Sequence, residues 1–316
     1  GWDIGGTWKI NCGSDYPRLS WEEGVIHNDC LSFEGAGTSE NPYKIDSCEK
    51  LEAISMNLNA HYELIQNINC SGINFIPIAS NYSTVGGCPI SGKEFTGSLN
   101  GNNYIINNLY INRSRSCLGL FAYTKNAQIY DLQLVYPSIR FGSYEGGIAG
   151  IMDGGIVNNV RISNTFMSDQ VYNVGGLVGK MLSGNISNSS VTGTIWHTFV
   201  SGGLVGIMLD GSISNSYSRV ILNSNGNTKG GILGAIYGGS INNVYSTGLI
   251  SVSSPPYGGL VAYVEGNPTC TNSYWDTQTS GISTSALCSD GGRTTAQMKT
   301  QDTYVGWDFD NIWSID

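Results

Sequence analysis

Four aspartates lie within the middle half of this sequence, and carboxylates are the groups that polysaccharide-cleaving enzymes use as general acid and base. They are Asp131, Asp153, Asp169 and Asp210. Such chemistry needs two carboxylates that converge on one face, whereas these four do not share one position of the repeats described below. Asp153 and Asp210 follow similar Gly-Gly units, but related copies carry Ser183 and Gly238 nearby. We therefore predict turn residues and no enzymatic activity.

Metal and cofactor chemistry is not expected either. The chain has three histidines, His27, His61 and His197, and no pair of cysteines at CxxC spacing, so a zinc site is not predicted. The nine-residue Asp repeat of calcium-binding solenoids is missing as well. We interpret His197 as a surface histidine, with a role in a binding face as the alternative.

Eight cysteines flank a long cysteine-free region, residues 118–269. An even number at wide spacing favours disulfides in an oxidising compartment, with free buried thiols as the alternative. Eight cysteines allow 105 pairings. Pairing nearest neighbours gives Cys12–Cys30, Cys48–Cys70, Cys88–Cys117 and Cys270–Cys288. The last pair is the best defined, because its two members are isolated near the C-terminal end.

Five Asn-x-Ser sequons make N-glycosylation a candidate modification. They begin at Asn69, Asn81, Asn112, Asn185 and Asn188. Asn81 lies in a polar loop and is the preferred candidate. Asn188 belongs to a predicted ladder of stacked asparagines, and we expect it to be buried and unmodified.

The strongest pattern is a five-residue glycine unit with a nearly constant period. Its copies are Gly146–Gly150, Gly175–Gly179, Gly202–Gly206, Gly230–Gly234 and Gly258–Ala262, with a weaker copy at Leu118–Ala122. The five copies lie 29, 27, 28 and 28 residues apart. A fixed period of this length is typical of a solenoid, in which each repeat forms one coil. At a corner, the glycines would supply positive φ or allow two backbones to approach closely.

A second mark in each coil places an apolar residue, usually Ile, two positions before Asn or Asp. The steps are Ile106-x-Asn108, Ile129-x-Asp131, Ile156-x-Asn158, Ile186-x-Asn188, Ile213-x-Asn215, Ile241-x-Asn243 and Cys270-x-Asn272. Neighbouring strands lie about 4.8 Å apart, so stacked coils would align these residues in columns. The Ile column would fill the core, and the Asn column would form a ladder of side-chain amides. We predict an all-β fold, a parallel β-solenoid of coils of about 28 residues.

Short helices are predicted to cover both ends, because a bare terminal coil exposes strand edges and apolar interior. Asp46-x-x-Glu49 is a capping box that predicts a helix over residues 47–57, and Thr294-x-x-Gln297 predicts a second helix. Strands are predicted over residues 62–68, 75–78 and 95–99. The resulting divisions are an N-terminal segment (1–29), an N-terminal cap with the first coils (30–117), the repeats (118–276), and a C-terminal cap and tail (277–316).

The two ends of the chain resemble each other. Gly1, Trp2, Asp3, Trp8 and Ile10 align without a gap with Gly306, Trp307, Asp308, Trp313 and Ile315. This likeness favours tandem units with a period of about 305 residues, or subunits whose N-terminal segment docks on a neighbour. Two unrelated Trp-rich edge strands are the simpler alternative. Trp2, Trp8, Trp21, Trp307 and Trp313 are therefore the candidates for an assembly interface.

The composition of the chain limits the classes of partner that we expect for it. The net charge is −9, which argues against nucleic acid as a partner. The sequence contains no run of 18 apolar residues, so it predicts no membrane span. Hydrophobic residues make up 40% and charged residues 12% of the chain, typical of a folded protein with a neutral polar surface. The sequence lacks both an initiator Met and a signal peptide, so we expect a processed product or an excised piece.

The Gly-Gly-Leu-Val-Gly units followed by Gly-x-Ile-x-Asn-Ser resemble the GLUG motif over roughly residues 118–276. Segments around Cys48–Ile54, Tyr62–Cys70 and Ser273–Gly281 look like those that bracket such repeats. GLUG repeats are found in large surface proteins of bacteria and archaea, including adhesin-like chains. The resemblance implies a right-handed β-solenoid at the cell surface or outside the cell, and it implies no catalytic activity.

Three functions follow from these observations, in order of preference. The first is an extracellular structural protein, the head-to-tail building block of a surface filament, stalk or fibre, whose partners are copies of itself. The second is an adhesin that binds glycans through an aromatic-bearing face. The third, least favoured, is a polysaccharide-degrading enzyme.

Overall fold

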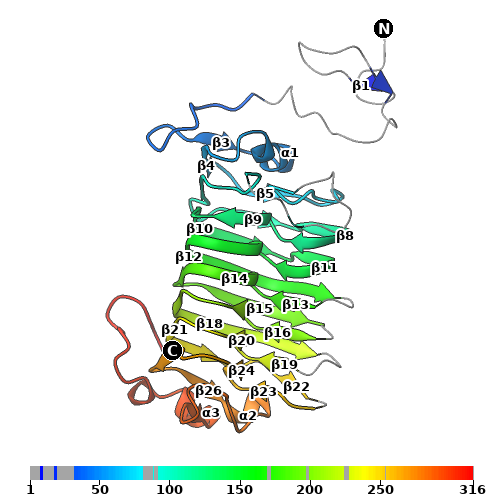
Figure 1. Cartoon of the computed structure of the whole chain (residues 1–316). Helices are drawn as coiled ribbons and strands as arrows, with labels where there is room; N and C mark the ends of the chain where they lie inside the picture. The colour runs from blue at the N-terminus through cyan, green and yellow to red at the C-terminus, as the bar shows by residue number, and fades with distance from the viewer. Residues whose placement is uncertain are drawn as a thin grey trace.

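Parallel strands stacked coil upon coil form the body of the molecule (Figure 1). The computed structural model describes residues 8–9, 18–19, 32–80, 88, 92–168, 172–196, 199–223, 228–252 and 254–315. Every strand pairing from β3 to β27 in these residues is parallel, which confirms the predicted β-solenoid. A two-stranded antiparallel pair, β1 (Trp8–Lys9) and β2 (Arg18–Leu19), precedes it.

The elements follow one another in short runs. The N-terminal cap and first coils contain β3 (Tyr43–Ile45), α1 (Cys48–Ala53), the 3₁₀ turn η1 (Ile54–Met56), β4 (His61–Leu64), β5 (Ile68–Asn69), β6 (Ser98–Asn100), β7 (Ile105–Asn107) and β8 (Tyr110–Leu118). The repeats contain β9 (Phe121–Lys125), β10 (Gln128–Val135), β11 (Ser138–Gly146), β12 (Ala149–Ser168), β13 (Asn173–Gly175), β14 (Val178–Ser187), β15 (Ser190–Ile195), β16 (Val200–Gly202), β17 (Val205–Met208), β18 (Ser212–Asn223), β19 (Thr228–Gly230), β20 (Leu233–Ile236), β21 (Ser240–Ser246), β22 (Ile250–Ser251), β23 (Tyr257–Gly258), β24 (Val261–Val264), β25 (Thr269–Thr271) and β26 (Tyr274–Asp276). The C-terminal cap contains α2 (Thr277–Ser280), β27 (Gly292–Arg293), α3 (Thr295–Met298) and η2 (Gln301–Thr303).

The core is a set of apolar columns that run along the stack. One column joins Tyr62, Leu99, Ile129, Val157, Ile186, Ile213, Ile241 and Cys270. Its members from Tyr62 to Ile241 are at most 2% exposed. Because side chains alternate between faces of a strand, the residues on either side of this column point outward.

For two of the predicted Ile-x-Asn steps, the Ile does not lie in the core column to which the prediction assigned it. Val157, not Ile156, pairs with Ile129, and Ile156 is 42% exposed whereas Val157 is 2% exposed. Ile106 pairs with Leu134 and so belongs to another buried column. The mismatch arises because Ile156 and Val157 are adjacent and both apolar, so sequence alone does not decide which one faces the core.

The Asn column marks a corner of each coil. Its members have left-handed backbone conformations, with φ between +47° and +53°: Asp131, Asn159, Asn188, Asn215, Asn243 and Asn272. The amide ladder is only partly formed, since Asn159 Nδ2 donates to Asp131 Oδ1 (2.7 Å) and Asn243 Nδ2 to Asn215 Oδ1 (3.3 Å). Asn188 instead donates to Asn158 Oδ1 (2.8 Å) and is exposed, contrary to the prediction that it would be buried.

The Gly-Gly corners serve close backbone approach, the second of the two predicted roles. Positive φ values occur at other glycines, and not at Gly202 or Gly203. A Cβ atom on Gly203 would lie 2.1 Å from the carbonyl oxygen of Gly231 in the next coil. Adjacent coils therefore touch backbone to backbone here, and any side chain would separate them.

Helices cover both ends, as predicted, although the first begins one residue later than expected. Ser47, not Asp46, caps α1, and its hydroxyl accepts from the Lys50 backbone N–H (3.3 Å). Asp46 forms an ion pair with Lys50 Nζ (2.9 Å) instead. At the other end Thr294 and Gln297 form the predicted capping box of α3.

Candidate functional site

Three of the four aspartates considered above lie within the described residues, and each has hydrogen-bond partners of its own. Asp131 accepts from Asn159 within the corner column, and Asp210 Oδ1 accepts from the Gly211 backbone N–H (2.8 Å), as a turn residue does. Asp153 lies 3.5 Å from the hydroxyls of Tyr123 and Ser183. Asp169 and His197 fall outside the described residues. In the part of the chain that the structure describes, no group of three or more His, Cys, Asp or Glu side chains could hold a metal ion.

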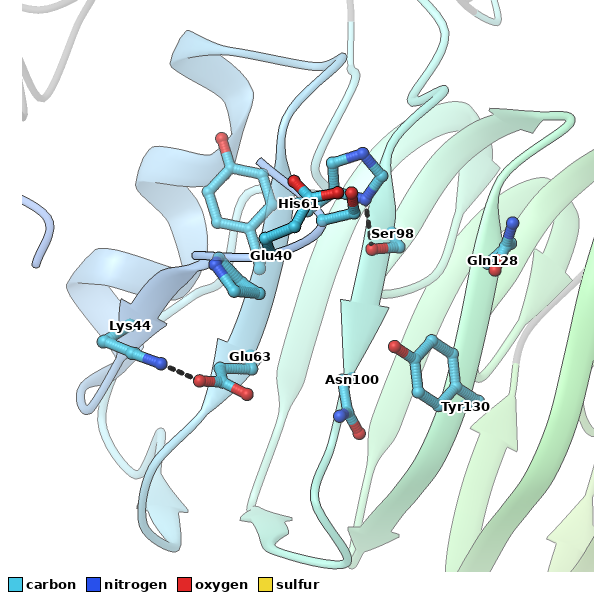
Figure 2. Close-up of a pocket in the computed structure, with 11 residues that line it drawn as sticks. Glu40, Lys44, His61, Glu63, Ser98, Asn100, Gln128 and Tyr130 are labelled. Carbon is cyan, nitrogen blue, oxygen red and sulfur yellow. Dashed lines mark hydrogen bonds and ion pairs between the residues drawn. The ribbon is translucent and has the colours of Figure 1, made fainter. Parts of the chain in front are cut away.

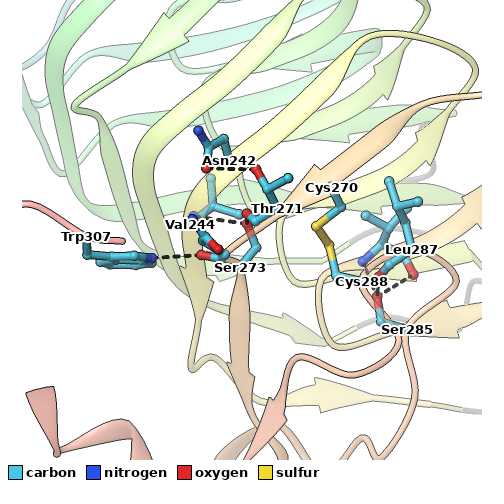
Figure 3. Close-up of a disulfide and its surroundings, with 11 residues drawn as sticks. Asn242, Val244, Cys270, Thr271, Ser273, Ser285, Leu287, Cys288 and Trp307 are labelled. Atoms are coloured by element: carbon cyan, nitrogen blue, oxygen red, sulfur yellow. Dashed lines mark hydrogen bonds between the residues drawn. A yellow bond between two sulfur atoms is a disulfide. The ribbon is translucent and has the colours of Figure 1, made fainter. Parts of the chain in front are cut away.

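Three disulfides join the cysteine pairs Cys48–Cys70, Cys88–Cys117 and Cys270–Cys288. Figure 3 shows the last of these, which ties β25 to the loop between α2 and β27. Cys12 and Cys30 lie outside the described residues. Among the sequon asparagines, Asn69, Asn112 and Asn185 are exposed, and Asn81 lies outside the described residues.

An uncharged polar face flanks the main core column on the outside of the stack. The residues just before and just after the column members alternate outward, and from β12 to β25 they are Ile156, Asn158, Asn185, Ser187, Ser212, Ser214, Ser240, Asn242, Thr269 and Thr271. Hydroxyls donate to amide oxygens of the next coil, as from Ser212 to Asn185 (2.7 Å) and from Thr271 to Asn242 (2.9 Å). From β14 onward this polar face carries hydrogen-bonding groups at the spacing of the strands, whereas in β12 Ile156 is an apolar position within it.

At its N-terminal end the polar face opens into a groove of about 410 Å³. The floor is a grid in which His61, Ser98 and Gln128 form one row across β4, β6 and β10, and Glu63, Asn100 and Tyr130 form the other. One wall is the loop from Ser39 to Lys44 (Figure 2). We call this site the polar groove.

Charges in the polar groove are arranged so that its one ammonium group is neutralised. Lys44 Nζ forms an ion pair with Glu63 Oε1, and the other carboxylate oxygen accepts from Asn102 Nδ2 (3.1 Å). His61 Nδ1 is hydrogen-bonded to Ser98 Oγ (2.8 Å). Glu40 is fully exposed at the rim, and hydrogen bonds from Ser39 and from its own backbone lower the pKa of this carboxyl group. The rim is therefore negative at neutral pH.

The C-terminal tail lies at the opposite end of the stack (Figure 1), where it packs on a ladder of tyrosines. Tyr217, Tyr245 and Tyr274 occupy one outward column over three successive coils, and the Tyr217 and Tyr245 rings stack with centroids 4.8 Å apart. We call this the tyrosine ladder. Trp307 and Trp313 lie against it, with their ring centroids 6.2 and 5.8 Å from that of Tyr245.

Specific contacts fix the tail in this position. Trp307 is 8% exposed, and its Nε1–H donates to the Asn272 carbonyl oxygen (2.7 Å; Figure 3). Gly306 has φ +78°, and a Cβ there would lie 2.8 Å from Asn272 Nδ2. Asp308 Oδ1 accepts from the backbone N–H groups of Asp310 and Asn311, at 3.0 Å each. This turn returns the chain so that Trp313 meets Trp307, with centroids 4.3 Å apart.

These contacts change the interpretation of the Trp residues that the sequence marks as interface candidates. Trp307 and Trp313 pack against their own chain, and Trp307 is buried there with Tyr274, Met298 and Tyr304. The side chains of Trp2, Trp8 and Trp21 lie outside the described residues.

A further group of aromatic side chains is exposed where the coils turn after β12 and β15. Phe166 is 36% exposed, Trp196 48%, Tyr172 58% and Phe199 51%. The rings of Tyr172 and Phe199 stack with centroids 5.0 Å apart. We call this group the aromatic edge.

The polar groove is not among the sites predicted from the sequence. Its floor residues come from three coils, and two of these precede the regular Gly-Gly repeats. The available signal was the alternation in His61-Tyr62-Glu63, Ser98-Leu99-Asn100 and Gln128-Ile129-Tyr130, in which a buried residue lies between two polar or outward ones. Aligning the three central residues would have brought the six floor residues together.

A family model described as the GLUG motif matches residues 170–195. The other copies of the glycine unit stack in register with this segment, since Gly175 pairs with Gly202, and Gly202 with Gly230. The chain therefore carries the GLUG motif and stacked copies of its glycine unit. No helix in the described part of this GLUG-repeat chain is long and apolar enough to cross a membrane.

Two curated proteins resemble the GLUG-repeat chain over part of its length. Halomucin of Haloquadratum walsbyi is 34% identical over 171 residues, which are 52% of this chain and 2% of halomucin. A "Putative Gly-rich membrane protein" of Evansella cellulosilytica is 29% identical over 143 residues, 40% of this chain and 15% of that protein. The chain thus spans only a small part of the length of both relatives.

Two solved structures share the fold. One is described as a "putative immunoglobulin A1 protease" from Bacteroides ovatus, with a TM-score of 0.59, 16% identity, and coverage of 87% of this chain and 90% of that one. The other, described as "IgA1 Protease", has a TM-score of 0.56 and 20% identity, and covers 86% of this chain and 25% of that one. At these identities the likeness concerns the fold alone.

Proposed function

We propose that this GLUG-repeat chain is an extracellular structural protein that assembles head to tail into a cell-surface filament, stalk or fibre. The observation that carries the proposal is the likeness of residues 1–11 to residues 306–316, combined with the contacts of the second segment. Four of the five shared residues are those that hold the tail: Gly306, Trp307, Asp308 and Trp313. The fifth shared residue, Ile315, is 38% exposed.

The counterparts Gly1, Trp2, Asp3 and Trp8 carry the same chemistry at the same spacing. They therefore suit a surface like the tyrosine ladder. The ladder of one copy would accept residues 1–10 of the next copy when its own tail is displaced. An exchange of equivalent segments is a low-cost route to association, and a contact of this head-to-tail kind produces an open filament.

Two further observations support a structural role at the surface. The names of the curated relatives include a membrane protein, and the chain corresponds to a small part of much longer proteins. Asp131 and Asp210 accept hydrogen bonds at a coil corner and in a turn, which supports the roles predicted for them rather than that of a catalytic pair. We therefore propose no catalytic activity.

Deleting residues 1–22 tests the proposal. We expect the full chain to form end-to-end oligomers in negative-stain microscopy and light scattering, and the deletion variant to stay monomeric with an unchanged β-sheet circular dichroism spectrum. Persistent end-to-end assembly of the deletion variant would refute the head-to-tail model.

Tryptophan substitutions distinguish specific docking from nonspecific association. Trp2→Ala with Trp8→Ala should prevent assembly, whereas Trp21→Ala, which has no counterpart in the tail, should not. Trp307→Ala with Trp313→Ala should free the tyrosine ladder and so lower the concentration at which oligomers form. If that tail variant assembles less readily than the unmodified chain, the ladder is not the acceptor.

A further inference from the structure

The polar groove lies at the other end of the stack from the tail, and head-to-tail docking on the tyrosine ladder does not use it. Its volume of about 410 Å³ falls within the usual range for small-molecule sites, roughly 300–1,000 Å³. Most such sites are lined by apolar side chains, whereas the floor here is made of imidazole, hydroxyl, amide, carboxylate and phenol groups. A ligand that matches this lining must itself be rich in hydrogen-bonding groups.

The charges exclude anionic ligands. The ammonium of Lys44 is already paired with Glu63, whose second oxygen is bound by Asn102. The remaining formal charge that lines the groove is the carboxylate of Glu40, with a lowered pKa. The whole chain carries a net charge of −9, which adds to the repulsion of acidic polymers. The groove therefore favours a neutral ligand.

The geometry of the floor favours a flat ligand with hydroxyls along both edges. Ser98 and Gln128 lie in one row, and Asn100 and Tyr130 in the other, one strand spacing apart along each row. Side-chain amides and hydroxyls can both donate and accept hydrogen bonds, so they can bind a ligand hydroxyl as either its donor or its acceptor. Figure 2 shows Tyr130 beside Asn100 on the floor, where its half-buried ring offers an apolar surface between polar groups.

The two rows do not end at the groove. They continue along the stack as the polar face, whose Asn, Ser and Thr residues from Asn158 to Thr271 are uncharged and partly or fully exposed. A chain-like ligand that extends from the groove passes Ile156 and Asn158 in β12, and from β14 to β25 it meets hydrogen-bonding groups in both rows. We propose that the polar groove binds a neutral oligosaccharide, and that longer saccharide chains extend from it along the polar face.

Calorimetric titration of the full chain tests this proposal. The probes are four neutral hexasaccharides, derived from cellulose, starch, mannan and chitin, together with the corresponding disaccharides and one acidic probe, hexagalacturonate. We expect at least one neutral hexasaccharide to bind with a Kd of about 1 mM or tighter, more tightly than its disaccharide. Tyr130→Ala should weaken binding by about tenfold, because the ring contact is lost.

Trp196→Ala is the matched control, since Trp196 is an exposed aromatic residue on the aromatic edge rather than in the groove. It should leave the affinity unchanged, and circular dichroism should show that both variants are folded. Absence of binding by every neutral hexasaccharide would overturn the proposal. So would tighter binding of hexagalacturonate, or loss of binding in Trp196→Ala and not in Tyr130→Ala.

Discussion

At the scale of single residues, the coil corners depend on asparagine. Six successive corners hold Asp131, Asn159, Asn188, Asn215, Asn243 and Asn272 in the left-handed region. Residues other than glycine pay roughly 1–2 kcal/mol to enter this region, and Asn and Asp tolerate it best because their short side chains hydrogen-bond locally. The repeated Asn therefore sets the direction of the chain at each corner, and its side-chain ladder is a secondary contribution.

Substitutions at Asn215 test this ranking. Asn215 has φ +47°, and its Oδ1 accepts a long hydrogen bond (3.3 Å) from Asn243 Nδ2. Asn215→Ala should lower the free energy of unfolding by about 1–2 kcal/mol, because alanine is strained at positive φ. Asn215→Gly also removes the hydrogen bond but fits the backbone, and it should cost only a few tenths of a kcal/mol. Equal losses in urea denaturation would show that the ladder matters more than the conformation.

The Asn corners illustrate which features of the fold could be predicted from the sequence and which could not. The period, the buried apolar column and the presence of Asn beside it follow from the pattern. The register at Val157 does not, because Ile156 is equally apolar and only the position of the left-handed Asn159 decides which of the two points inward. The conformational role of Asn could not be separated from a hydrogen-bonding role, since the same residue type suits both.

At the scale of elements, the two ends of the stack are closed differently. The first end carries α1, which the Cys48–Cys70 disulfide ties to the residue that follows β5. The second end carries the tail, whose aromatic cluster holds Tyr274, Met298, Tyr304 and Trp307. Capping boxes in the sequence predicted both helices, although only the box of Thr294 and Gln297 forms. The polar groove and the tyrosine ladder were not predicted, because each combines outward residues of several coils and no local pattern marks them.

The tail should detach at alkaline pH. Burial raises the pKa of Tyr304 to about 12, against a value of 10.0 for the free side chain, and its hydroxyl donates to the Met298 carbonyl oxygen (2.6 Å). The docked tail therefore keeps its proton at a pH where the released tail loses it. The contribution of Tyr304 to docking is complete below pH 10, declines between pH 10 and about 12, and is lost above that.

Tryptophan fluorescence reports this release, since Trp307 is buried in the docked tail and would shift to longer wavelength in water. The neighbouring groups that influence the titration are Tyr245, Asp276, Arg219 and Tyr274. Tyr304→Phe keeps the ring but cannot ionise, so its transition should move to higher pH. An identical midpoint in the Tyr304→Phe variant would exclude Tyr304 as the titrating group.

At the scale of the whole molecule, the solenoid is a sum of nearly interchangeable coils. In such a fold, stability comes from each repeat and its two interfaces, so an intact repeat can be removed if the columns on either side match. Gly146 pairs with Gly175, and Gly175 with Gly202. Deleting residues 147–175 would therefore place Gly146 beside Gly202, Ile129 beside Ile186, and Ile139 beside Ile195.

We expect this deletion variant to fold into a shorter stack, with a β-sheet circular dichroism spectrum, a cooperative thermal transition and a modestly lower Tm. Deleting residues 147–160 instead removes about half a coil and takes the corners and core columns of neighbouring coils out of register, so this variant should aggregate or fail to fold. The polar groove and the tyrosine ladder lie outside both deletions. The shorter stack should therefore keep any saccharide binding and any end-to-end assembly, and small-angle scattering should show a shorter repeat along the oligomer. Loss of both properties in a folded variant would mean that the coils are not independent units and that the middle of the stack contributes to its ends.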